Sequence, residues 1–220
     1  MSYSVAIDGP AGAGKSTIAK EIAKRLNYIY VDTGAMYRAM ALFLLQCGVD
    51  VNHSTEISEK CKDAEITIAY KDQEQMVLLN GENVNPYIRS EEVGNMASFS
   101  SANREVRLKL IDLQRNLAKW NNVIMDGRDI GTYVLPDANV KVFLTASSIV
   151  RARRRYDELT SKGIPCNLQT IEDDIIERDE RDMNREIAPL KQAEDAILID
   201  SSAMTIEEVI EAIIKLVNHN

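Results

Sequence analysis

The segment 9–16 reads GPAGAGKS and matches the pattern G-x-x-x-x-G-K-[ST] at every fixed position. The apolar run 5–7 precedes it, and a helical pattern with Ile18, Ile22 and Leu26 on one face follows it. This order of strand, glycine-rich loop and helix is typical of a phosphate-binding loop. The glycines let several backbone N–H groups point at one anion, and the helix N-terminus adds its positive end.

This loop predicts specific contacts with a nucleoside triphosphate. Lys15 is expected to reach the β- and γ-phosphates, and the Ser16 hydroxyl is expected to bind Mg²⁺. The predicted ATP-binding residues are Gly9, Pro10, Ala11, Gly12, Ala13, Gly14, Lys15, Ser16 and Thr17. A glycine-rich turn without a ligand is the alternative. A dinucleotide-binding fingerprint does not fit, because Thr17 stands where its third glycine is required.

Length and charge limit the classes of protein to be considered. The chain has 220 residues, which is room for one domain with an insertion. We expect no signal peptide, because strand-like residues begin almost at once, and the apolar stretch 39–45 is too short to cross a membrane. The formal net charge of −8 argues against a broad nucleic-acid-binding surface but allows a local basic site. We therefore expect small-molecule partners and neither a membrane nor a nucleic acid. We also expect a monomer.

Cysteines and histidines are few. Cys47, Cys61 and Cys166 are scattered and lack metal-binding spacing, so we expect reduced thiols and a cytoplasmic location. His53 and His219 lie outside every motif that carries chemistry. A mechanism built on those motifs must therefore work without histidine.

The fold class follows from the pattern of apolar runs. Four further short runs have the length and composition of buried strands: 28–31, 123–125, 140–144 and 196–199. Helical patterns separate most of them, which favours an α/β fold with a parallel sheet covered on both faces. The last helix is predicted after a capping box of Thr205 and Glu208, with Ile206 and the later apolar residues facing the core.

One segment departs from this alternation. The runs 65–70 and 75–79 have strand character, and the strong hairpin signal Asn80-Gly81 follows them. We predict a small antiparallel unit that a parallel sheet cannot contain. A plain hairpin and a subdomain that covers a substrate both remain open. The predicted division of the chain is a core of 1–62 and 91–220 and an insertion of 63–90.

Two polar segments follow predicted strands: DTGAMYR at 32–38 and DGRD at 126–129. In open α/β sheets ligands bind at the carboxyl ends of the strands, so both segments are expected beside the phosphate loop. Asp126 has two interpretations, orientation of the waters around Mg²⁺ or capping of a loop. The sequence does not separate them.

Arginines cluster in two places late in the chain. The first cluster, which follows run 140–144, consists of Arg151, Arg153, Arg154 and Arg155. The second shares one face of a helix that Thr170 and Asp173 are expected to cap, and consists of Arg178, Arg181 and Arg185 with Asp182. A solvated face of ion pairs would explain such a pattern. Their position beside a phosphate loop favours phosphate binding instead, because a guanidinium donates two hydrogen bonds at once and stays charged.

This combination favours phosphoryl transfer. The reaction requires positioning and charge neutralisation, which mobile arginines in a lid at about 151–170 would supply while excluding water. An acceptor that is itself a phosphate has a second pKa of about 6 and is largely a dianion at neutral pH. It needs no general base, in agreement with the lack of a placed histidine.

The chain resembles the bacterial cytidylate kinase family nearly from end to end. The segments that carry the resemblance are GPAGAGKST at 9–17, DTGAMYR at 32–38, the insertion 63–90, DGRDIGT at 126–132 and RDERDMNREIAPL at 178–190. The phosphate loop alone would not separate this family from adenylate, guanylate or shikimate kinases. The resemblance implies a three-layer P-loop fold with a five-stranded parallel sheet, a monophosphate-binding insertion and an arginine-rich lid. It also implies phosphorylation of CMP and dCMP by ATP with Mg²⁺.

The resemblance further implies roles for single residues. Those that would bind the acceptor nucleotide are Thr33, Tyr37, Arg38, Ser98, Arg107, Arg128, Asp129, Arg178, Asp182 and Arg185. Those expected to act in catalysis are Lys15, Arg128, Arg153, Arg154 and Arg185. Within the first set, Ser98, Arg107 and Asp129 would read the cytosine. A carboxylate accepts a hydrogen bond from the exocyclic amine of cytosine, whereas uracil presents an acceptor there and is repelled.

Three alternatives remain at this point. A kinase for another monophosphate, chiefly UMP, would use the same fold. A P-loop ATPase or nucleotide sensor would hydrolyse ATP without an acceptor, although no water-positioning glutamine is evident. A nucleic-acid-binding module would need a broad basic face, and the chain offers only short arginine clusters.

Overall fold

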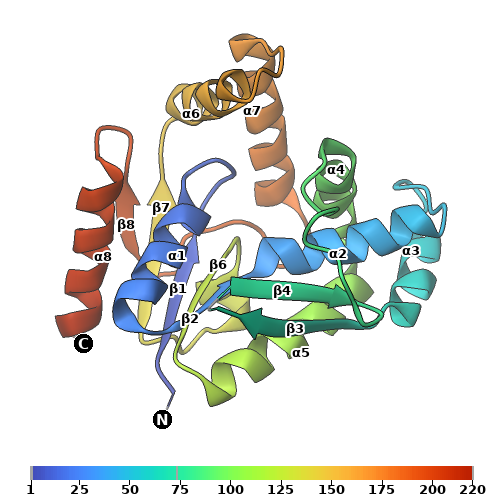
Figure 1. Ribbon diagram of the computed structural model, residues 1–220, viewed down its shortest axis with the longest axis horizontal. Helices are drawn as coiled ribbons and strands as arrows, with labels where there is room; N and C mark the ends of the chain where they lie inside the picture. Colours follow the sequence, from blue (N-terminus) through green and yellow to red (C-terminus); the bar gives the residue numbers. More distant parts are fainter. Residues whose placement is uncertain (1, 73, 220) are drawn as a thin grey trace.

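A five-stranded parallel sheet lies at the centre of the computed structural model, which describes residues 2–72 and 74–219 (Figure 1). The strand order is β2-β6-β1-β7-β8. The strands are β1 (Ser4–Asp8), β2 (Ile29–Asp32), β6 (Val123–Gly127), β7 (Val140–Thr145) and β8 (Ile197–Asp200). All five predicted runs are confirmed as strands. Asp126 and Gly127 belong to β6, which is longer than predicted, because both residues continue its pairing with β1.

Helices cover both faces of this sheet. One layer consists of α1 (Lys15–Leu26) and α8 (Ile206–His219), and the other of α2 (Thr33–Gln46) and α5 (Arg104–Trp120), with α3 (Ser54–Lys60), a 3₁₀ turn (Cys61–Asp63) and α4 (Glu91–Ser100) packed beside them. Successive residues of β1 alternate between the layers: Val5 and Ile7 pack with α1 and α8, and Ala6 packs on the opposite side. The apolar strands are therefore buried on both faces, as parallel strands require.

The predicted antiparallel unit is a three-stranded sheet in the order β3-β4-β5. Its strands are β3 (Ile66–Lys71), β4 (Glu74–Leu79) and β5 (Glu82–Asn83). Gln75 attaches it to the core, because its amide accepts from the Asp32 N–H at 2.8 Å and donates to the Asp32 carbonyl at 3.1 Å. The small sheet is thus held at the carboxyl end of β2, in front of the core in Figure 1.

Two helices project past the carboxyl ends of the strands, at the top of Figure 1: α6 (Ser148–Ser161) and α7 (Leu168–Asn184). The predicted cap of the second helix is wrong. The Asn167 side chain accepts from the Thr170 N–H at 3.1 Å, so the helix begins earlier than a cap at Thr170 and Asp173 would allow. Arg185 follows the last helical residue and has extended backbone.

The capping box at the last helix is confirmed, since Glu208 N–H donates to Thr205 Oγ1 at 3.2 Å and Thr205 N–H donates to Glu208 Oε2 at 2.8 Å. Ile206 does not face the core as predicted and is 58% exposed, because the first turn of α8 lies at the rim of a cavity. The three cysteines are free, as predicted. Within the described ranges, no helix combines the length and apolar character needed to cross a bilayer.

Candidate active site

A cavity of about 720 Å³ lies where the carboxyl ends of the strands meet. Strand register places Asp32 beside Asp126 and Asp8 beside Gly127 at this edge. Ten basic and five acidic side chains line the cavity. A chain with a net charge of −8 therefore has a local basic site here, which suits a ligand carrying several negative charges.

The phosphate loop forms one wall of this cavity. Gly9, Gly12 and Gly14 have φ values of +146°, +75° and +88°. Residues with a Cβ atom rarely adopt such positive φ values. A Cβ at Gly9 would also lie 1.9 Å from the Leu144 carbonyl oxygen. Ala11 to Thr17 line the cavity, whereas Gly9 and Pro10, which were also predicted to bind ATP, are not among its lining residues.

Lys15 is buried in this wall, and its ammonium group donates to the Pro10 carbonyl at 2.7 Å. Burial, followed by the nearby charge of Arg128, lowers the pKa of Lys15 well below its usual range. Such an ammonium group is poorly solvated. It is therefore suited to exchange its hydrogen bond with the Pro10 carbonyl for contacts with phosphate oxygens.

Ser16 and Asp126 meet at the centre of the site. The Ser16 hydroxyl donates to one Asp126 oxygen at 2.8 Å, and the Tyr30 hydroxyl donates to the other at 3.0 Å. Burial, followed by the charge of Asp32, raises the pKa of Asp126 to about 6. A hydroxyl and a carboxylate are the oxygen donors that Mg²⁺ takes beside phosphates and water, so the pair fits the ion. The contact favours the Mg²⁺ interpretation of Asp126 over the loop cap.

Asp8 holds the next segment in place. Its carboxylate accepts from the N–H groups of Ile130 and Gly131 at 2.8 and 2.7 Å, at the start of a π-helical turn (Ile130–Val134) that directly follows Asp129. Burial raises the pKa of Asp8 to about 6 despite these two hydrogen bonds. Sequence reasoning missed this residue, although an acid at the end of the first strand was a signal.

Asp129 is the centre of a buried group that we call the Asp129 cluster, made of Asp129, Arg107 and Arg185. Arg107 on α5 forms an ion pair with Asp129 and is 1% exposed, and Arg185 donates to the same carboxylate at 3.1 Å. Ser98 Oγ and Arg107 Nε lie beside the cavity, buried and without partners among the described residues. The structure thus brings the three predicted base-reading residues together, with polar atoms left to bind a ligand.

The other predicted acceptor-binding residues line the same cavity. Asp182 accepts from Arg128 Nε at 2.8 Å, and the Thr33 hydroxyl donates to the Asp126 carbonyl at 2.7 Å. Arg178 Nε has no partner in the described chain, and burial lowers the pKa of this guanidinium to about 10. Arg38 and Tyr37 complete the set. This concentration of buried guanidinium groups is suited to phosphate oxygens.

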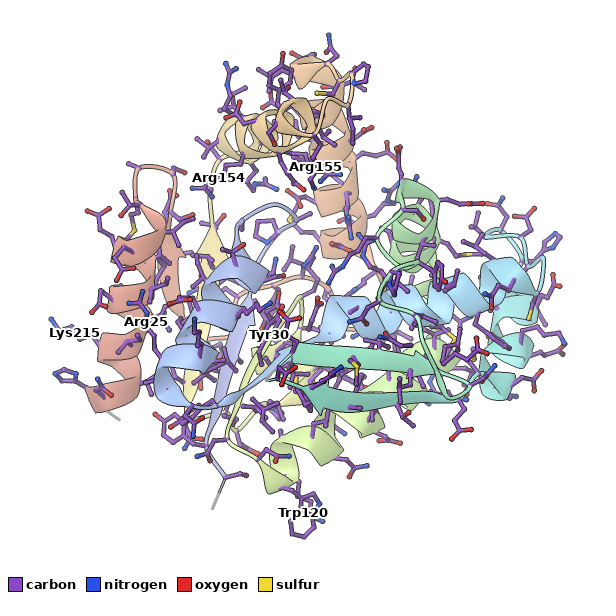
Figure 2. All side chains as sticks on the ribbon, in the orientation of Figure 1. Arg25, Tyr30, Trp120, Arg154, Arg155 and Lys215 are labelled. Atoms are coloured by element: carbon purple, nitrogen blue, oxygen red, sulfur yellow. The ribbon has the colours of Figure 1, made fainter. Side chains whose placement is uncertain are left out.

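Three of the four arginines of α6 line the cavity. Arg154 and Arg155 do so on the helix that lies above the phosphate loop (Figure 2), where Arg154 donates to the Ser201 carbonyl at 2.8 Å and Arg155 pairs with Glu158 at 2.8 Å. Arg151 is structural as well as cavity-lining: it forms a 2.6 Å ion pair with Asp179 of α7 and donates to the Ala11 carbonyl at 2.9 Å. Arg153 is outside the cavity lining, with its guanidinium carbon 5.9 Å from the centre of the Tyr156 ring.

Besides Arg151, two cavity-lining arginines were absent from the predicted site residues. Arg155 belonged to a recognised cluster, so a signal was present in the sequence. Arg89 follows the antiparallel sheet and forms a 2.7 Å ion pair with Asp32. It had no motif around it, and only the packing of the insertion against β2 brings it to the site.

Comparison with known proteins assigns the chain to a family. The sequence pattern of the family described as Cytidylate kinase matches residues 5–219. The chain belongs to the cytidylate kinase family. The cytidylate kinase of Geobacillus sp. (strain WCH70) is 50% identical over 214 residues, which cover 97% of this chain and 96% of the relative. That of Caldicellulosiruptor saccharolyticus is 52% identical over 212 residues, which cover 96% and 94%. The resemblance inferred from the motifs is confirmed.

Solved structures support the fold of this cytidylate kinase family member. An uncharacterised protein from Eubacterium ventriosum has a TM-score of 0.55 at 12% identity and covers 99% of both chains. Shikimate kinase from Acinetobacter baumannii, in complex with shikimate, has a TM-score of 0.51 at 14% identity, with 100% of this chain and 95% of that one covered. These similarities concern the fold alone.

Proposed function

We propose that the protein transfers the γ-phosphoryl group of ATP to CMP or dCMP. The observation that carries the proposal is that one cavity joins the phosphate loop to the Asp129 cluster. The loop supplies a site for a triphosphate, and the cluster supplies a buried carboxylate that accepts from an exocyclic amine. Family membership and the names of the relatives support the same activity.

Each part of the reaction has a residue to perform it. Lys15 and the loop N–H groups bind the β- and γ-phosphates. Ser16 and Asp126 would hold Mg²⁺, which would supply further neutralisation of phosphate charge. Arg38, Arg128 and Arg185 hold the acceptor phosphate. That phosphate is largely a dianion at neutral pH and attacks without a general base. Arg154 and Arg155 approach the transferring group and neutralise the charge of the transition state.

The division of the chain fits this scheme. The insertion 63–90 closes the acceptor side through Arg89, and the lid at about 151–170 brings its arginines over the donor phosphates and excludes water. The working state is a monomer in the cytoplasm, where the three free thiols would stay reduced.

ADP release in a coupled assay with Mg-ATP tests the proposal against CMP, dCMP, UMP, AMP and GMP. Strong stimulation by CMP and dCMP with weak stimulation by UMP is the expected result. Stimulation led by another monophosphate would keep the phosphate-loop mechanism and overturn the role of the base-reading residues. ADP release that does not depend on an acceptor would assign the protein to the ATPases.

A further inference from the structure

Gln114 on α5 is a buried side chain with no evident partner. It follows Arg107 by seven residues, which is nearly two helical turns, so the two side chains share one side of the helix. Gln114 is 1% exposed, and neither its amide nitrogen nor its amide oxygen has a hydrogen-bond partner in the described structure. A buried amide in this state costs folding free energy, which an apolar side chain of the same size would not cost.

The Tyr37 hydroxyl, which comes from α2, is in the same condition. It is buried and without a partner among the described residues. Burial raises the pKa of Tyr37 to about 12, and among the neighbours that oppose this rise are the Arg107 charge and the Gln114 amide. Tyr37 and Gln114 lie on two helices that pack against each other, α2 and α5, and no hydrogen bond of normal geometry joins their polar groups. Hydrogen bonds at a site are often long in the free protein and tighten when a ligand binds.

Tyr37 connects this amide to the site. The Arg107 guanidinium carbon lies 5.7 Å from the centre of the Tyr37 ring, and Arg107 forms the ion pair with Asp129. Tyr37 and Arg107 both line the cavity, whereas Gln114 lies behind them and does not. The Tyr37 ring and Arg107 thus connect the interface of α2 and α5 to the carboxylate of the Asp129 cluster.

We propose that Gln114 is a positioning residue: its amide holds the Tyr37 hydroxyl, and the Tyr37 ring holds Arg107 and Asp129 in the arrangement that distinguishes cytosine from uracil. The inference rests on the proposed function. It explains why an amide occupies a position where packing alone would favour leucine or methionine. Gln114 lowers the stability of the fold, and in return it contributes to substrate selectivity at a site that it does not touch.

The test compares Gln114→Met, Tyr37→Phe and the double variant with the wild type. Methionine fills a similar volume without polar amide atoms, and phenylalanine removes only the hydroxyl. Gln46→Met, at the exposed end of α2, is the matched control. The measurements are kcat/KM with CMP and with UMP, and the thermal unfolding midpoint of each variant.

We expect Gln114→Met to unfold at the same temperature as the wild type or higher, while its CMP:UMP ratio of kcat/KM falls about fivefold to tenfold, the loss of roughly one hydrogen bond. Tyr37→Phe should lower the CMP:UMP ratio of kcat/KM by a similar factor. The double variant should lose no more than either single variant, because both changes break the same contact.

An unchanged CMP:UMP ratio in Gln114→Met, or multiplied losses in the double variant, would overturn the inference. A lower unfolding midpoint with unchanged selectivity would assign Gln114 to packing and overturn it too. If Gln114→Met does not fold, Tyr37→Phe must still lose selectivity for the inference to stand. A wild type inactive on CMP overturns the proposed function together with this inference, whereas an active wild type with a fully selective Gln114→Met overturns the inference alone.

Discussion

Ser16 donates a hydrogen bond of 2.8 Å to Asp126, and this contact joins the phosphate loop to the end of β6. The two residues are 110 positions apart, so only the pairing of β1 with β6 brings them together. The same pairing places the carboxylate within reach of any cation that the Ser16 hydroxyl binds.

Asp126→Asn removes the negative charge but keeps an oxygen that can accept from Ser16. We expect kcat to fall about a hundredfold and the Mg²⁺ concentration for half-maximal activity to rise, because the ion loses a charged neighbour. The KM for CMP should change little, since the Asp126 carboxylate accepts from Ser16 and Tyr30 and from none of the base-reading residues. Steady-state assays over a Mg²⁺ series measure both. Asp137→Asn, at an exposed position, is the control, and an unchanged Mg²⁺ requirement in Asp126→Asn would contradict the assignment.

Asp129→Asn changes the group that reads the base. An amide can donate to uracil, so we expect kcat/KM for CMP to fall by about ten- to a hundredfold and the CMP:UMP ratio to fall with it. The KM for ATP should remain close to that of the wild type. Arg107 and Arg185 lose their counter-charge, so the thermal unfolding midpoint should also fall. A CMP:UMP ratio equal to that of the wild type would remove Asp129 from base selection.

Arg154→Ala and Arg153→Ala form a matched pair on one helix. Arg154 lines the cavity, whereas Arg153 lies over Tyr156 outside it. We expect Arg154→Ala to reduce kcat about a hundredfold with little change in the KM for CMP, because its charge acts on the transition state. The kcat of Arg153→Ala should stay within about threefold of the wild-type kcat. Equal losses of kcat in the two variants would show that Arg153 enters the cavity during turnover.

Asp8 predicts a pH dependence of stability. Burial raises its pKa from 3.8 to about 6, so the folded protein keeps this proton to higher pH than the unfolded chain does. The contribution of Asp8 is therefore full below about pH 4 and is lost as the pH rises through about 6. An asparagine side chain cannot ionise, so the wild type should lose up to about 3 kcal/mol of unfolding free energy relative to Asp8→Asn between these pH values. Urea unfolding of both proteins at about pH 4 and about pH 7 measures the difference, and parallel pH profiles would refute it.

Local patterns predicted much of the architecture because they act over a few residues. The glycines of the phosphate loop adopt the positive φ values that their motif requires. Asn80-Gly81 forms the hairpin turn, with φ values of +50° and +84°. The cap at Asn167 was missed, because Thr170 and Asp173 offer equally good capping side chains and the choice depends on where the preceding turn ends.

The sequence by itself determined the strands, the phosphate loop and the residue types of the site, since strand periodicity and loop conformation are set by neighbours along the chain. Tertiary structure alone decided which charges face the cavity. Arg151 and Arg154 line it, with Arg151 also fixed to Asp179, whereas Arg153 turns to Tyr156, although the three are nearly consecutive on one helix. It also decided that Asp8 supports the Asp129 segment. The reason is physical: burial and charge partners come from segments far away in the chain, and a linear pattern does not contain them.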